Sequence, residues 1–188
     1  FPTAMILPQQ EVASPAGIAL AVEQFAERFG KPVVLYIKHD RAVEPEAVGR
    51  LMERGVLSAV KYAVRRDDAR VDPYLEELVE AAGPTRMLSG LGDQPAPIHM
   101  SQFRLASFTT GCGCVAPRLC MALHAAINAN DVDRVETILQ KFAPLEDLRN
   151  RYGVITVLHE AFRLAGIADN GPVLPLLTPV DRAQPETI

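Results

Sequence analysis

Lys61 has the residue type and the position that covalent chemistry on a carbonyl compound requires. It lies near the end of an apolar run, residues 56–63, that predicts a β-strand. A lysine on such a strand either extends its amine to solvent or is desolvated, and desolvation lowers the amine pKa from about 10.4 toward neutrality. A neutral amine attacks ketones, so Lys61 is a candidate nucleophile, although the strand taken alone favours the solvent-reaching alternative.

Tyr36 lies near the end of the preceding apolar run, residues 33–37, which is apolar on both faces as a buried strand would be. If the two runs are adjacent parallel strands, Tyr36 comes to lie beside Lys61. A phenol at that position can transfer protons to and from a carbonyl oxygen and the neighbouring carbon. The alternative is an amphipathic tyrosine that packs at the rim of the sheet.

The elements that would position these residues follow a regular order. Short apolar runs alternate with amphipathic stretches, which is typical of βα units with a parallel sheet. Ser14 before Pro15 predicts the start of a helix that ends at Gly30, and Asp72 before Pro73 predicts another start. The predicted strands cover residues 3–7, 33–37, 56–63, 86–89 and 107–110, and the predicted helices cover residues 15–30, 44–54, 73–82 and a short stretch after Pro95.

After Pro117 the pattern is helical throughout, over residues 119–128, 132–142, 145–151 and 154–165. Five βα repeats at intervals of roughly 20 to 30 residues are typical of a (β/α)8 barrel of about 250 residues. We therefore predict an α/β fold in which residues 1–116 are the five C-terminal units of such a barrel. Residues 117–188 would form the last barrel helix and a C-terminal helical extension. Because the chain opens without Met in a strand-like run, we expect the N-terminal three units to lie upstream.

The composition of the chain argues against some classes of binding partner. The chain is 48% hydrophobic and 22% charged, as a globular protein with a core would be, and its net charge is -4. Its basic residues are scattered, so no patch is expected to neutralise the phosphates of a nucleic acid. No apolar run approaches the roughly 20 residues that cross a bilayer, and no signal peptide is recognisable. We expect no nucleic acid or membrane partner, and a cytoplasmic location.

Other residues of metal-binding or anion-binding type are assigned structural roles. Three cysteines within nine residues, Cys112, Cys114 and Cys120, suit reduced thiols better than a disulfide framework or a metal site. His159 and Glu160 lack the second histidine of a helical zinc motif, so we predict no metal site. Gly90 and Gly92 are interpreted as a tight turn, and residues 65–68 as a solvated loop. Arg149 and Arg151 are interpreted as a charge pair at the end of a helix, and the alternative for them is contact with an anionic substrate.

Four motifs, in their order and spacing, resemble the dihydrodipicolinate synthase and N-acetylneuraminate lyase family of Schiff-base (β/α)8 barrels. They are Leu35-Tyr36, Ala59-Val60-Lys61, Leu88-Ser89-Gly90 and the glycine-rich segment 110–113. The resemblance extends into the helical part, where residues 150–153 and 172–176 are most similar to the sugar-acid dehydratase branch.

This resemblance implies that Lys61 forms the Schiff base with a 2-oxo acid, usually pyruvate, and that Tyr36 is the proton relay. It places Arg41 where family members bind a substrate carboxylate, and Thr109 where a backbone carbonyl faces the keto acid. Gly90, from the third motif, joins the substrate-binding residues. The implied partners are the 2-oxo acid with an aldehyde or a sugar acid, in a homotetramer, and no metal or organic cofactor is implied.

Departures from the family pattern concern the second substrate. Residues 37–39 are Ile-Lys-His, where the family usually has Asn-x-Pro. Tyr62 and Ala63 follow Lys61, where the family commonly has Glu-Ala or Asp, and Cys114 stands where many members have Asn. The Gly-Thr-Thr-Gly-Glu loop that holds the keto-acid carboxylate would lie upstream of Phe1. Three functions stay open: an aldolase or synthase acting on carbon-carbon bonds, a sugar-acid dehydratase acting on carbon-oxygen bonds, and a non-catalytic barrel that binds a keto acid or only assembles.

Overall fold

The structure, a computed structural model, describes residues 1–8 and 12–180. The chain divides into two compact units, Phe1–Thr109 and the segment from Thr110 onward. This division falls earlier than the predicted boundary between residues 116 and 117, because the short 3-10 helix η2 (Cys112–Cys114) packs with the helices that follow it. The last eight residues of the predicted extension, 181–188, lie outside the described residues.

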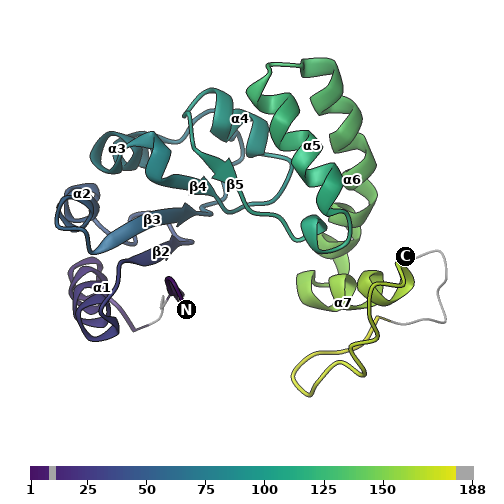
Figure 1. Ribbon diagram of the computed structural model, residues 1–188, viewed down its shortest axis with the longest axis horizontal. Coiled ribbons are helices and arrows are strands. Elements are labelled where there is room, and N and C mark those ends of the chain that lie inside the picture. The colour runs from purple at the N-terminus through teal and green to yellow at the C-terminus, as the bar shows by residue number, and fades with distance from the viewer. Residues whose placement is uncertain (9–11, 181–188) are drawn as a thin grey trace. The chain divides into compact units, whose positions relative to one another are not determined.

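The first unit is built on a sheet of five parallel strands in the order β1-β2-β3-β4-β5 (Figure 1). Each strand follows its neighbour in the chain through a crossover, as the predicted βα rhythm requires. The strands are β1 (Met5–Ile6), β2 (Val33–Ile37), β3 (Leu57–Tyr62), β4 (Met87–Ser89) and β5 (Ser107–Phe108), and the helices between them are α1 (Pro15–Phe29), α2 (Pro45–Glu53), α3 (Pro73–Ala82) and α4 (Ala96–Ser101), with a 3-10 turn, η1 (Pro84–Arg86), before β4.

Local capping chemistry sets the ends of α1 and α3 where the sequence predicted them. The Ser14 hydroxyl accepts a hydrogen bond from the Gly17 amide at the start of α1, and Gly30 ends that helix with a φ of 72°, in the left-handed region. The Asp72 carboxylate accepts from the Leu75 amide at the start of α3. Both helices therefore start at a proline preceded by a side-chain cap.

Helices α1, α2 and α3 cover one face of the sheet and bury a continuous apolar core (Figure 1). Val60 and Tyr62 of β3 point into this core, so Lys61 between them belongs to the opposite face. Strict alternation along β3 would place Leu57 on the face of Lys61, but Leu57 is buried in the core. The pairing of β2 with β3 shifts by one residue at Ser58, so alternation is interrupted there and Leu57 joins the core.

A buried polar network fastens the start of α3 to β3. Asp72, only 1% exposed, accepts hydrogen bonds from the Tyr62 hydroxyl at 2.6 Å, from Arg66 at 2.9 Å and from the Leu75 amide at 3.1 Å. Arg66 also binds Asp40 in the loop after β2. The prediction of a solvated loop at residues 65–68 is therefore wrong for Arg66, because a buried carboxylate requires a cationic partner.

The protonation of Tyr62 keeps this network in one arrangement. Burial raises the pKa of Tyr62, and the hydrogen bond and negative charge of Asp72 raise it further. The phenol consequently stays protonated and acts as a donor to Asp72. This explains the departure from the family pattern after Lys61, since Tyr62 serves the core and the helix cap rather than the face that carries the lysine.

The second unit consists of η2 and three helices, α5 (Pro117–Asn128), α6 (Val132–Tyr152) and α7 (Val154–Leu164). Two separate helices were predicted over residues 132–142 and 145–151, but the structure has one helix, α6, with Pro144 inside it. A proline removes one helical hydrogen bond without ending a helix whose flanks are held. Here Phe142 and Glu146 are both buried on either side of the proline, so packing keeps the helix continuous.

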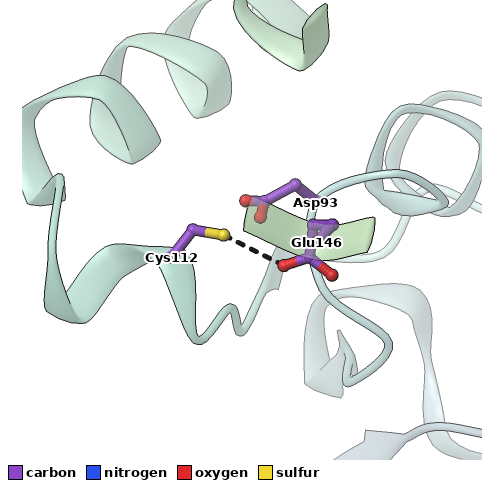
Figure 2. A group of neighbouring side chains, drawn as sticks. All are labelled: Asp93, Cys112 and Glu146. Carbon is purple, nitrogen blue, oxygen red and sulfur yellow. Dashed lines mark hydrogen bonds between the residues drawn. The ribbon is translucent and has the colours of Figure 1, made fainter. Parts of the chain in front are cut away.

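A buried cluster joins η2 to α6 in this unit. The Cys112 thiol donates a hydrogen bond of 3.0 Å to the Glu146 carboxylate, drawn as a dashed line in Figure 2. Arg149 pairs with the same carboxylate, and its guanidinium lies so close to Gly111 that a Cβ there would come within 2.5 Å of it. Arg149 and Arg151 both lie in the last turn of α6, as predicted, and Arg149 is in addition largely buried in its ion pair. Among the described residues, no helix is both long enough and apolar enough to cross a membrane.

The Asp72 network leads to a prediction about stability. We expect Asp72→Ala to lower the free energy of unfolding by about 3 kcal/mol, because the Tyr62 hydroxyl and the Arg66 guanidinium lose their acceptor and the helix loses its cap. Urea unfolding followed by circular dichroism measures the change. The control Asp67→Ala, exposed in the same loop, should stay within about 0.5 kcal/mol of the unchanged protein. Equal losses for the two variants would contradict the role assigned to Asp72.

Candidate active site

Lys61 and Tyr36 lie side by side on the face of the sheet opposite the helix-covered core. Their Cα atoms are direct partners in the pairing of β2 with β3, and Lys61 is in turn paired with Leu88 of β4. The Lys61 Nζ atom lies 4.4 Å from the centroid of the Tyr36 ring. Both residues stand near the C-terminal ends of their strands, the end at which parallel barrels carry their active sites.

The environment of Lys61 favours an uncharged amine more than water does. The side chain is half-buried, and burial lowers the pKa of Lys61 from its ordinary value of 10.5 because the ammonium form loses hydration. A larger fraction of the amine is therefore neutral at a given pH than for an exposed lysine. This is the physical condition that nucleophilic attack by a lysine requires.

Gly90 leaves the space through which the Lys61 side chain passes. A Cβ at Gly90 would lie 2.9 Å from the Lys61 Cε atom, 3.0 Å from its Cγ atom and 3.0 Å from the Ala63 Cβ atom. Gly90 also donates its amide hydrogen to the Tyr62 carbonyl oxygen at 2.6 Å, so its backbone continues the ladder between β3 and β4. The predicted substrate-binding residue is thus placed against the lysine, where any side chain would displace the amine-bearing arm.

Arg41 is engaged by another element. Its guanidinium forms two hydrogen bonds with the Glu77 carboxylate of α3, one of them 2.6 Å long, and lies 5.1 Å from the centroid of the Tyr74 ring. The hydrogen bond that Arg41 donates to Glu77 raises the pKa of Arg41. The carboxylate-binding role expected of Arg41 therefore stays a prediction, and in this structure its charge is compensated within the chain.

Thr109 follows β5 at the C-terminal edge of the sheet. Its amide donates to the Ser89 carbonyl oxygen at 2.8 Å, and its hydroxyl donates to the same oxygen at 3.4 Å. These bonds extend the pairing of β4 with β5 past the last strand residue. The expected contact of its carbonyl with a keto acid stays a prediction.

A cavity of about 320 Å³ opens beside Tyr36 and was not foreseen from the sequence. It is bounded by the end of β1, the first turns of α1, the end of β2 and the loop that follows β2. On α1 it is lined by Gly17, Ile18 and Ala21. In the sequence, Ile18 and Ala21 belong to the predicted helix 15–30, and helical periodicity does not reveal which of its residues face a cavity.

Two buried polar residues behind the site were also missed. The Ser89 hydroxyl and His99 Nδ1 lie 2.8 Å apart, and the His99 ring contacts Tyr62 edge-on at 6.3 Å between centroids. Burial lowers the pKa of His99, although the charge of Asp72 opposes this. His99 therefore supports the core beneath β3 and β4 as a neutral ring. A lone histidine on a short predicted helix carries no signal for that role.

No family model matches the chain. In sequence it is 28% identical over 180 residues to the 4-hydroxy-tetrahydrodipicolinate synthase of Corynebacterium aurimucosum, and 26% identical over 183 residues to that of Corynebacterium urealyticum. These matches cover 92% and 96% of this chain but 56% and 58% of the relatives. The chain thus spans a little over half the length of the curated relatives that it matches.

Solved structures share its fold. Dihydrodipicolinate synthase from Oceanobacillus iheyensis aligns with a TM-score of 0.81 at 20% identity, over 99% of this chain and 62% of that one. The enzyme from Bacillus clausii aligns with a TM-score of 0.81 at 22% identity, over 97% and 62%. The fold class is therefore α/β, a five-stranded part of a (β/α)8 barrel followed by helices, as the sequence predicted. The chain is thus similar in sequence to two 4-hydroxy-tetrahydrodipicolinate synthases and similar in fold to solved dihydrodipicolinate synthases.

The contact between Gly90 and Lys61 can be tested directly. We expect Gly90→Ala to push the lysine arm toward solvent and to raise the pKa of Lys61 toward its ordinary value of 10.5. An NMR titration of reductively ¹³C-methylated lysines measures this pKa. The control Gly113→Ala, whose Cβ would meet its nearest neighbour at an ordinary 3.6 Å, should leave it unchanged. An unaltered Lys61 pKa in Gly90→Ala would show that the arm does not depend on this glycine.

Proposed function

We propose that Lys61 and Tyr36 serve a lyase or synthase that acts on a pyruvate-like 2-oxo acid through a lysine Schiff base. The proposal rests on the position of the half-buried Lys61 side chain. Its arm packs against Gly90, and its Nζ atom lies 4.4 Å from the centroid of the Tyr36 ring. The names of the curated relatives, both 4-hydroxy-tetrahydrodipicolinate synthases, support the same reaction class. Because the chain spans a little over half of those relatives, the activity is proposed for the enzyme to which this chain contributes these residues.

The reaction begins when the neutral Lys61 amine adds to the ketone carbon of the 2-oxo acid. The resulting carbinolamine loses water and becomes an iminium, which withdraws electrons from the neighbouring carbon. Loss of a proton from that carbon gives an enamine, and the Tyr36 hydroxyl is placed to receive and return protons at this stage. The enamine carbon then attacks an aldehyde carbon, a carbon-carbon bond forms, the new alkoxide takes up a proton, and water releases the product from Lys61.

Carbon-carbon chemistry is the first choice because both curated relatives are named as synthases. A sugar-acid dehydratase would use the same iminium to expel a hydroxyl group, and the similarity of residues 150–153 and 172–176 to that branch keeps it as the second candidate. The two differ in product, since cleavage of a sugar acid releases pyruvate and an aldehyde, whereas dehydration releases water and leaves a dehydrated acid with its carbon chain intact. A homotetrameric assembly and a cytoplasmic location accompany the proposal as expectations.

Borohydride trapping tests the nucleophile. Incubation with pyruvate followed by reduction should leave a stable adduct on Lys61, identified by peptide mass spectrometry. Only the neutral amine reacts, and burial lowers the pKa of Lys61, so the rate of adduct formation should reach half of its maximum below pH 10.5. The control Lys61→Arg keeps a positive charge and should give no adduct. Absence of an adduct with pyruvate and with longer 2-oxo acids would refute the enzyme and leave the non-catalytic barrel.

The role of Tyr36 is tested separately. We expect Tyr36→Phe to keep the aromatic ring beside the amine but to slow proton transfer about 100-fold, within the range for loss of a general acid or base. Exchange of the pyruvate methyl protons with deuterium oxide, followed by proton NMR, reports enamine formation. Adduct trapping at long incubation times should persist in this variant. Unchanged exchange rates would exclude Tyr36 as the proton relay.

A further inference from the structure

The face of the Tyr36 ring is turned toward the Lys61 amine. The Lys61 Nζ atom lies over this ring, 4.4 Å from its centroid. A cation within about 6 Å of an aromatic centroid is attracted by the negative charge on the face of the ring. Lys61 is half-buried, so water screens this attraction less than it would at an exposed site. The ring is therefore placed to act on the charge of the Lys61 nitrogen, independently of the Tyr36 hydroxyl.

No carboxylate compensates this nitrogen among the residues that the structure describes. Arg41 and Arg66 are each paired with acidic side chains, whereas the Lys61 side chain forms no ion pair or hydrogen bond with a described residue. Burial of a cation without a counter-ion is unfavourable, and it lowers the pKa of Lys61. The Tyr36 ring therefore provides the attraction for a positive charge that no described carboxylate provides here.

Neighbouring strands keep the nitrogen over the ring. Tyr36 and Lys61 are direct partners in the pairing of β2 with β3. On the other side of β3 the lysine arm packs against Gly90, where a Cβ would lie 2.9 Å from the Lys61 Cε atom. Because the arm is in contact on both sides, the nitrogen can keep its place over the ring when the carbon of a ketone replaces its hydrogens. The same ring face then meets the nitrogen of the covalent adduct.

We infer, on the basis of the proposed function, that the face of the Tyr36 ring stabilises the positive charge of the iminium on Lys61, in addition to proton transfer by the Tyr36 hydroxyl. The carbinolamine hydroxyl takes up a proton and leaves as water, and the nitrogen lone pair forms the C=N bond, so one positive charge remains on nitrogen. When the neighbouring carbon loses a proton, the C–H electron pair forms a C=C bond, the C=N pair returns to nitrogen, and the charge is lost. The ring therefore favours the iminium over the neutral carbinolamine before it and the neutral enamine after it.

A series of fluorinated rings at position 36 tests this role. Fluorine withdraws electrons from the face of a ring with little change in its size, and Tyr36→Phe is the reference because none of these rings carries a hydroxyl. We expect Tyr36→trifluorophenylalanine, with fluorine at ring positions 3, 4 and 5, to lower the ratio of iminium to enamine on Lys61 about threefold relative to Tyr36→Phe. The ratio is measured by ¹³C NMR with pyruvate labelled at its carbonyl carbon. A constant ratio across the series would overturn the inference.

The resting amine gives a second measurement that needs no substrate. Because a less negative ring face stabilises the ammonium form less, the pKa of Lys61 should fall as fluorine is added, as followed by NMR of ¹³C-methylated lysines. The control Phe25→trifluorophenylalanine, at a 45% exposed position on α1, should change neither quantity. A Lys61 pKa that does not respond to fluorine would show that the ring contact is packing alone. Failure of the proposed function is recognised separately, because no pyruvate adduct would then form on Lys61 of the unchanged protein.

Discussion

The in-register pairing of β2 with β3 is the constraint on which the candidate site depends. Tyr36 and Lys61 are 25 positions apart in the sequence, and their meeting is the direct result of parallel hydrogen bonding between the two strands. Alternation then assigns the two chemical groups to one face and the buried side chains Ile37 and Tyr62 to the other. A slip of one residue would turn Lys61 into the apolar core and Tyr62 out of it. The core beneath the helices therefore fixes the face on which Lys61 stands.

Much of this could be predicted because the relevant signals are local. Proline after a capping residue located the starts of α1 and α3, and the run Val33–Ile37 located β2, since each depends on a few adjacent side chains. The neighbourhood of Tyr36 and Lys61 followed from the order of βα units, because consecutive parallel strands usually lie side by side.

The remaining features depend on contacts between segments distant in sequence. The pairing of Arg41 with Glu77 and that of the half-buried Arg66 with the buried Asp72 cannot be obtained from a charge pattern, since the same charged residues are equally compatible with a solvated surface. The cavity beside Tyr36 depends on the separation of elements rather than on residue type. The continuity of α6 through Pro144 depends on packing that outweighs the local preference of proline.

The Asp72 network has a consequence for sequence change among relatives of this chain. Its single carboxylate receives donors from β3, from the loop after β3 and from the first turn of α3, so substitutions at Asp72, Tyr62 and Arg66 are energetically coupled. A relative that lacks the acid should also lack the phenol at the position of Tyr62 and the guanidinium at that of Arg66. The three positions should consequently covary as a set, while Lys61, located between two of them on the opposite face, remains free to be conserved independently.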